Sequence, residues 1–185
     1  MASNFARHIL NKYDDYRIII VDALTYAGSM ENVPDHERIE FWYGDVRNAD
    51  LIGTLMPKVD AVAHFAAETH VTRSIFDNKI FFETDVLGTQ CIANAVLKND
   101  NVKRFIHIST SEVYGTAIGD QMDEEHPLNP MSPYAAAKAG ADRLVYSYHQ
   151  TYGIPATIIR PFNNYGPRQH LEKVVPRFIT SCLLD

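Results

Sequence analysis

The sequence has few cysteines, no excess of basic residues and no long apolar run. Its two cysteines, Cys91 and Cys182, are too few and too far apart for a disulfide framework or a cysteine metal site. The 17 basic residues stand against 23 acidic ones, so the formal charge is −6, which argues against non-specific nucleic-acid binding. No run reaches the roughly 20 apolar residues that cross a bilayer, and the N-terminus lacks the apolar stretch of a signal peptide. We therefore expect a cytoplasmic protein with no nucleic-acid or membrane partner.

Short apolar runs typical of strands alternate with segments of helical period. The strand candidates are Arg17–Asp22, Ile39–Tyr43, Ala61–Phe65, Arg104–Ile108 and Ala156–Arg160. This alternation implies βαβ units and predicts an α/β fold, a Rossmann-like doubly wound parallel sheet. Ligands of such sheets bind at the carboxyl ends of the strands, so functional residues are expected there.

Helix signals lie between these strands. An opening helix has Ser3 available as its cap. Its apolar face consists of Phe5, Ala6, Ile9 and Leu10. Another apolar stripe consists of Leu87, Cys91, Ile92, Ala95 and Val96. Ser132 followed by Pro133 places a cap residue before a proline at the first helical position, and predicts a helix that runs to about Tyr148.

Tyr134 and Lys138 are four residues apart and so share one face of this helix. A free phenol has a pKa near ~10, and a neighbouring ammonium group lowers that value. The pair therefore predicts a tyrosinate that takes a proton from a substrate hydroxyl, with Thr110 hydrogen-bonded to the same oxygen. A Tyr-x-x-x-Lys pair is often only a surface feature, but its position after a strand that ends in Ile-Ser-Thr favours a functional reading.

The ends of the other strand candidates carry weaker signals. Asp22 is placed to accept hydrogen bonds from adenosine ribose hydroxyls, which would favour NAD over NADP, although an Asp can also simply begin a turn. Asp45 follows the second strand candidate, and small residues after Phe65 would let a cofactor approach the backbone. His64 and His70 have no further ligand at zinc spacing, so no metal site is expected.

Six motifs together resemble the extended short-chain dehydrogenase/reductase family, specifically its NAD-dependent nucleotide-sugar epimerases and dehydratases. The motifs are Asp22–Gly28, Ala66–Ile75, Thr84–Thr89, Ser109–Gly115, the Tyr134/Lys138 pair and Arg160–Pro167. Within that family the sequence is most similar to the dTDP-glucose 4,6-dehydratases. The resemblance extends over essentially the whole chain.

The resemblance implies a role for each matching residue, with NAD as cofactor and a dTDP- or UDP-hexose as substrate. The implied NAD contacts are Asp22, Ala23, Leu24, Thr25, Asp45, Val46, Phe65, Ala66, Ala67, Thr84, Tyr134, Lys138 and Asn164. The implied substrate contacts are Thr69, Arg73, Thr110, Asn163, Lys173 and Val174. The implied catalytic residues are Tyr134, Lys138, Thr110, Glu112 and Ser111. Tyr134 would take the proton of the C4 hydroxyl while hydride passes from C4 to NAD. Glu112 would remove the C5 proton, water would leave from C6, and the hydride would return to C6.

One departure from the dehydratase pattern concerns the reaction. Ser111 stands where these dehydratases have an Asp that protonates the departing C6 hydroxyl, and serine does not readily supply that proton. The Thr-Ser-Glu triplet is also similar to that of UDP-glucuronate decarboxylases, in which no leaving-group acid is needed. No arginine can be assigned to a glucuronate carboxylate. The sequence therefore leaves dehydration, decarboxylation and 4-epimerisation open.

The other departure concerns the N-terminal region. The family begins with a strand and a Gly-x-x-Gly-x-x-Gly turn that binds pyrophosphate, and neither is present in this sequence. We expect a fragment in which residues 1–160 form a truncated dinucleotide-binding domain and residues 161–185 begin a substrate-binding lobe. Residues 1–185 alone are then expected to bind NAD weakly or not at all, and a non-catalytic fragment or binding module is the alternative. A full-length protein is expected to form a homodimer through the helices around residues 78–98 and 133–152.

Overall fold

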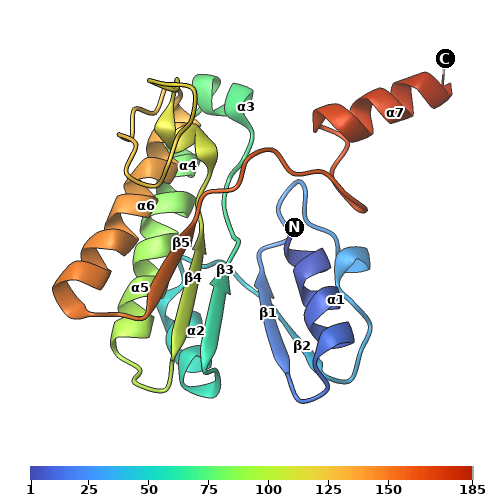
Figure 1. The fold of residues 1–185 in the computed structure, drawn as a ribbon. Coiled ribbons are helices and arrows are strands. Elements are labelled where there is room, and N and C mark those ends of the chain that lie inside the picture. Colours follow the sequence, from blue (N-terminus) through green and yellow to red (C-terminus); the bar gives the residue numbers. More distant parts are fainter. Residues whose placement is uncertain (185) are drawn as a thin grey trace. The chain divides into compact units, whose positions relative to one another are not determined.

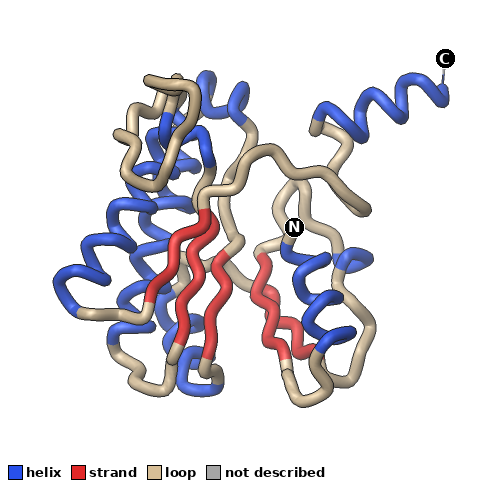
Figure 2. Tube along the Cα trace, in the orientation of Figure 1, coloured by secondary structure: helices blue, strands red, loops and turns tan. Residues whose placement is uncertain are grey.

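The computed structural model describes residues 1–184, which form two compact units (Figure 1). The terminal unit joins Met1–Gly44 to Asn163–Asp185, and the central unit is the continuous segment Asp45–Phe162. Each unit has its own parallel sheet (Figure 2). No helix within residues 1–184 is both long enough and apolar enough to span a membrane.

The terminal unit contains a two-stranded parallel sheet. Its elements are α1 (Ala2–Lys12), β1 (Ile18–Asp22), η1 (Met30–Asn32), β2 (Ile39–Tyr43) and α7 (Val174–Leu184). In the sheet, Ile18 lies opposite Ile39 and Asp22 lies opposite Tyr43. The helix α1 buries Ala6, and its apolar stripe is what fixes it to the unit.

The central unit contains a three-stranded parallel sheet in the order β3-β4-β5. Its elements are α2 (Ala49–Leu55), η2 (Met56–Lys58), β3 (Ala61–His64), α3 (Val71–Phe76), α4 (Lys79–Phe81), η3 (Phe82–Leu87), α5 (Gly88–Leu97), β4 (Arg104–Ile108), η4 (Ser111–Tyr114), α6 (Pro133–Tyr152) and β5 (Ala156–Ile159). The segment η3 is π-helical and leads directly into α5.

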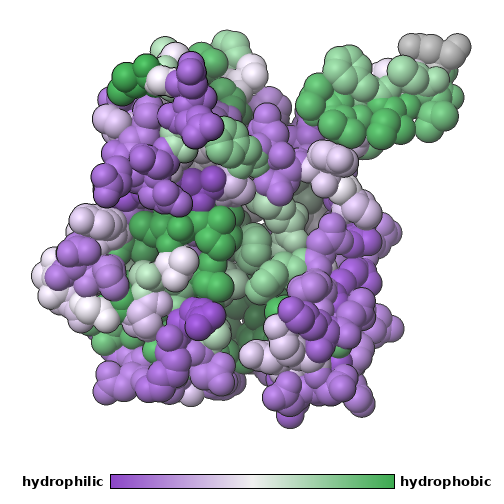
Figure 3. All heavy atoms as spheres, in the orientation of Figure 1, coloured by the Kyte–Doolittle hydropathy of each residue, from purple (hydrophilic) through white to green (hydrophobic). Residues whose placement is uncertain are grey.

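The core of the central unit lies between one face of this sheet and the helices α2, α5 and α6. Phe105 of β4 and Val145 of α6 are both fully buried there. Ile106 and Ile108 alternate with the buried positions of β4 and are half-buried, because they point to the opposite face. Figure 3 shows apolar surface over these strands and along α7, consistent with the exposed Ile159 and Phe178.

The strand predictions are confirmed for all five segments, with the third and fifth ending one residue earlier than expected. The parallel pairing is also as predicted. Within residues 1–184, β1 pairs only with β2, and β3 pairs only with β4.

Three helix details of the prediction are wrong. Ser3 is not a cap, because α1 begins at Ala2 and Met1 occupies the cap position. Leu87 is 53% exposed, since the π-helical turn shifts it out of the apolar stripe of α5. The helix α6 continues to Tyr152, where Gly153 adopts the left-handed conformation that ends it. The predicted domain boundary between residues 160 and 161 stays a prediction.

Candidate functional site

The start of α6 is fixed beside the end of β4 by a network of small side chains. The Ser132 hydroxyl accepts the N–H of Ala135 at 3.1 Å, which confirms the predicted cap. The N–H of Tyr134 donates to the Ser74 hydroxyl at 3.1 Å, and that hydroxyl donates to the carbonyl of Val71. The helix α3 therefore holds the first turn of α6, and with it the Tyr134 side chain.

The Tyr134 and Thr110 side chains lie close enough for Thr110 to influence the pKa of Tyr134. Both residues are buried. Burial raises the pKa of Tyr134 to about 12, and the carboxylates of Glu112 and Asp85 act in the same direction, whereas Thr110 opposes the shift. The expectation that Lys138 lowers this pKa is therefore wrong for the protein without ligands. The structure does bring together the phenol and the Thr110 hydroxyl that the sequence predicted to share a substrate oxygen.

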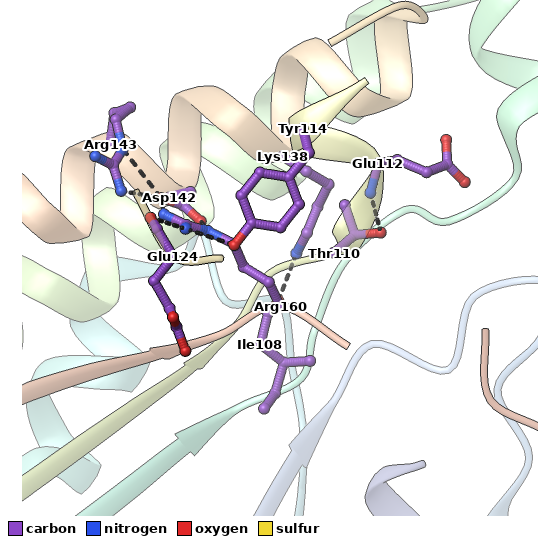
Figure 4. Close-up of polar contacts among 9 residues, drawn as sticks. All are labelled: Ile108, Thr110, Glu112, Tyr114, Glu124, Lys138, Asp142, Arg143 and Arg160. Atoms are coloured by element: carbon purple, nitrogen blue, oxygen red, sulfur yellow. Dashed lines mark hydrogen bonds and ion pairs between the residues drawn. The ribbon is translucent and has the colours of Figure 1, made fainter. Parts of the chain in front are cut away.

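Lys138 lies one turn further along α6, and its ammonium group is directed at β4. Its Nζ donates to the carbonyl of Ile108 at 2.7 Å (Figure 4). Burial lowers the pKa of Lys138, and the negative charges of Asp85 and Asp142 oppose that effect. An ammonium group has three donors, so two remain after the bond to Ile108.

Ser111 and Glu112 follow Thr110 in the short helix η4. The Thr110 hydroxyl accepts the N–H of Glu112 at 3.3 Å, and the N–H of Ser111 donates to the carbonyl of Pro161 at 3.0 Å. The Glu112 side chain is exposed and extends away from Lys138 in Figure 4. The turn thus presents one carboxylate to solvent at the end of β4, next to the Tyr134–Thr110 pair.

An ion-pair network around a buried carboxylate connects to the end of this turn. Asp142 of α6 is fully buried and receives two hydrogen bonds from Arg160, at 2.8 and 3.0 Å. Arg143 donates to the same carboxylate, and Arg160 also donates to the Tyr114 hydroxyl at 3.0 Å (Figure 4). Burial raises the pKa of Asp142, but the hydrogen bonds from the two arginines outweigh it and the pKa is lowered. The network joins α6, the segment after β5 and the end of η4.

The loop after β3 contributes the next predicted group. Its backbone N–H at Glu68 donates to the Asp85 carboxylate at 2.8 Å. Phe65, Ala66 and Ala67 are half-buried, and Thr69 is exposed. This loop therefore lies directly against η3.

Four further predicted residues of the central unit lie near α5 and η3 or at the start of α3. The Asp45 carboxylate is held by Arg47 at 2.6 Å, and the hydrogen bond from Arg47 lowers the pKa of Asp45. Val46 is buried beside Gly88, where an added Cβ would lie 2.8 Å from the Val46 side chain. Thr84 is half-buried in η3, and Arg73 is exposed. The Arg47 guanidinium therefore balances the negative charge of the Asp45 carboxylate.

In the terminal unit, the predicted adenosine-binding segment forms a tight turn after β1. The Asp22 carboxylate accepts the N–H of Leu24 at 2.7 Å. Leu24 has a φ of +46°, a left-handed conformation that a leucine rarely adopts. Gly28 closes the turn so tightly that a Cβ there would lie 2.6 Å from the Cα of Leu24. Ala23 is half-buried and Thr25 is exposed at this end of the sheet.

The segment after β5 packs against the same turn within the terminal unit. The Tyr26 hydroxyl donates to Glu172 at 3.0 Å, and its ring lies edge-on to His170. Lys173 forms an ion pair with Glu172 at 3.3 Å, and Val174 begins α7 with its side chain exposed. Asn163 and Asn164 begin this segment, and the Asn164 carbonyl accepts a bond from the Gln169 side chain. The predicted residues thus divide into one group in each unit.

Sequence reasoning missed two buried polar features. Asp85 lies inside the recognised Thr84–Thr89 motif, but no role was assigned to it. No helical period marked it as buried, because the segment around it is π-helical. His64 and His107 pair across β3 and β4, with ring centroids 5.5 Å apart. For the histidines, only strand register could have shown their proximity.

Comparison with known proteins identifies proteins that are similar to this chain in sequence. It is 46% identical to the low-salt glycan biosynthesis protein Agl12 of Haloferax volcanii over 97% of this chain. It is 45% identical to the dTDP-glucose 4,6-dehydratase of Streptomyces antibioticus over 99% of this chain. The chain spans 58% of the first relative's length and 56% of the second's.

A solved structure and a family profile agree with these relatives. The crystal structure of a double mutant of DesIV, a dTDP-glucose 4,6-dehydratase from Streptomyces venezuelae with NAD bound, matches with a TM-score of 0.93 at 44% identity. The match covers 98% of this chain and 58% of that chain, and it confirms the Rossmann-like fold. The profile described as GDP-mannose 4,6 dehydratase matches residues 2–185. That match includes the predicted residues of both units. The chain therefore belongs to the GDP-mannose 4,6 dehydratase family.

Proposed function

We propose that the protein is an NAD-dependent nucleotide-sugar 4,6-dehydratase that oxidises C4 of a dTDP-hexose and eliminates water across C5 and C6. The observation that carries this proposal is that the buried Tyr134 and Thr110 side chains interact at the end of β4, where the buried Lys138 ammonium, one turn further along α6, donates to the Ile108 carbonyl. Relatives that are named dTDP-glucose 4,6-dehydratase share 45% identity with the chain.

The residues present fit the cofactor in two places. At β4, the two remaining donors of Lys138 suit the hydroxyls of a ribose. At β1, the exposed Asp22 suits a second ribose, and its negative charge would repel a 2′-phosphate, which favours NAD over NADP. When bound, NAD supplies a hydride acceptor for C4 and returns the hydride to C6.

Proton transfers are assigned to two side chains, Tyr134 and Glu112. Tyr134 accepts the proton of the C4 hydroxyl, and Thr110 hydrogen-bonds the same oxygen. The C4 ketone makes the C5 proton acidic, and the exposed Glu112 carboxylate removes it and returns it to C5 when the hydride reaches C6. The C6 hydroxyl group takes a proton from solvent as it leaves as water. Because the pKa of Tyr134 is about 12 without ligands, the phenol must lose its proton in the loaded site before it can act as a base.

Ser111 supports a second candidate reaction. Its hydroxyl is a poor acid for a departing C6 hydroxyl group, whereas a decarboxylation of UDP-glucuronate or a 4-epimerisation needs no such acid. A non-catalytic binding module is the candidate of another class.

We also propose a cytoplasmic homodimer for the complete protein. Large side chains are exposed along the predicted dimer helices, among them Phe82 and Leu87 of η3 and Tyr146 of α6. Exposed apolar side chains on adjacent helices suit a helix-to-helix contact between two copies.

The test uses a hybrid enzyme in which this chain replaces the segment that it matches in the Streptomyces antibioticus relative. With NAD and dTDP-glucose, the hybrid should release a product lighter by one water, as measured by mass spectrometry. Tyr134→Phe should lower the rate about 100-fold or more, because general acid–base catalysis contributes that much. UDP-glucuronate and UDP-glucose serve as parallel substrates.

Each alternative has its own outcome in this experiment. Loss of CO₂ from UDP-glucuronate would favour the decarboxylase, and a product of unchanged mass would favour an epimerase. A folded hybrid that acts on none of these substrates would favour the binding module. Full activity in Tyr134→Phe would contradict the assignment of Tyr134.

A further inference from the structure

Asp85 is a buried carboxylate to which the proposed reaction gives no role. It lies in η3, which packs against α6, and it is 1% exposed. Its Oδ1 accepts the N–H of Glu68 at 2.8 Å, whereas Oδ2 has no hydrogen-bond partner among residues 1–184. An ionised carboxylate in such surroundings is costly unless a positive charge lies nearby.

Lys138 supplies the nearby positive charge. It is 4% exposed, and its Nζ donates to the Ile108 carbonyl. Burial raises the pKa of Asp85 to about 7 and lowers that of Lys138. The two residues lie on elements that pack together, since Val86, next to Asp85, packs against the cluster that contains Ala137, next to Lys138. The attraction between the two groups opposes both pKa shifts.

The other carboxylates near η3 already have cations of their own. Glu68 lies 3.7 Å from the Arg73 guanidinium, and its negative charge raises the pKa of Asp85. Asp142 of α6 is bound by Arg160 at 2.8 and 3.0 Å. Among these three carboxylates, Asp85 is therefore the one left to balance the lysine.

The two histidines and the tyrosine around the lysine are uncharged near neutral pH. Burial and the Lys138 charge lower the pKa of His64 to about 3 and lower that of His107 as well. Tyr134 is a neutral phenol, with a pKa of about 12. Among the groups that shift the pKa of Asp85, Lys138 is the one cation.

We infer that Asp85 is the buried counter-ion of Lys138 and a positioning residue that keeps the ammonium group charged at the end of β4. Its effect on catalysis rests on the proposed function, whereas the charge pairing itself does not. The pairing can therefore be tested on residues 1–185 without cofactor or substrate.

The direct test is an NMR titration of the Asp85 carboxyl carbon in the wild type and in Lys138→Met. Because the ammonium favours the ionised carboxylate, the titration midpoint should move to higher pH in the variant. The matched control, Lys98→Met, removes an exposed lysine after α5 and should leave the midpoint unchanged. An unchanged midpoint in Lys138→Met would overturn the inference.

Asp85→Asn gives an independent readout if Lys138→Met does not fold. The Lys138 Nζ signal should titrate at lower pH in this variant than in the wild type, since Asp85 raises the pKa of the lysine. Equal midpoints would again contradict the pairing. An inactive hybrid enzyme leaves both titrations intact, so the two proposals fail separately.

The pH dependence of unfolding follows from the raised pKa of Asp85. An acid with a pKa of about 7 when folded and 3.8 when unfolded stabilises the fold fully below 3.8, and this stability is lost as the pH rises through 7. Relative to Asp85→Asn, the wild-type folding equilibrium constant should fall on the order of 10²- to 10³-fold between pH 4 and pH 8. Urea unfolding across that range measures this, and Asp120→Asn, at an exposed site, should follow the wild type.

Discussion

Ser111 lies between Thr110 and Glu112 in the sequence. Its one polar side-chain group is a hydroxyl, which is a poor acid for a leaving oxygen. Ser111→Asp introduces a carboxyl group at this position of η4. If the hybrid enzyme eliminates water, this variant should raise kcat about 10- to 100-fold, because a positioned acid protonates the departing hydroxyl group. The measurement is the initial rate of water loss from dTDP-glucose.

Ser111→Asn is the matched control for this prediction. It has nearly the shape of Asp but cannot donate an acidic proton. The account expects Asn to give no gain in rate. An equal gain in both variants, or no gain in Asp, would show that protonation of the leaving group does not limit the reaction.

At the scale of single residues, spacing predicted which side chains would share a helical face but not their electrostatics. The helical period places Tyr134 and Lys138 on one face, and the strand end brings Thr110 to the phenol. The direction of the Tyr134 pKa shift depends on burial and on the charges of Glu112 and Asp85, which come from other elements. These contributions are set by tertiary packing, so no local motif reveals them.

The first turn of α6 carries the site, and Ser132 caps it with a bond of 3.1 Å to the N–H of Ala135. Ser132→Ala removes this bond and should lower the free energy of unfolding by about 1 kcal/mol. Urea unfolding of residues 1–185 measures the change. Ser147→Ala, on the exposed side of the same helix, should cost clearly less. Equal losses would mean that the cap does not stabilise α6.

At the scale of elements, apolar runs and cap residues predicted the strands and the start of α6. The apolar pattern was wrong at the junction where η3 leads directly into α5. Leu87 fits a regular helical stripe, but the π-helical turn of η3 rotates it into solvent. Such a turn places Asp85 in the interior, and a pattern based on 3.6 residues per turn cannot show it.

At the scale of the whole molecule, the chain forms two units, each with a parallel sheet. The parallel pairing of the strands follows from the alternation of strands and helices. The division of the predicted residues between the units was not evident from the sequence, because residues 163–174 return to the Asp22–Gly28 turn through contacts such as Tyr26 to Glu172.

The central claim is that this site moves hydrogen from C4 to C6 of one sugar. The most direct test supplies the hybrid enzyme with dTDP-glucose that carries deuterium at C4, and locates the label in the product by NMR. The account predicts deuterium in the C6 methyl group of a product that has lost water. Deuterium that remains at C4, or that is lost to solvent, would contradict it.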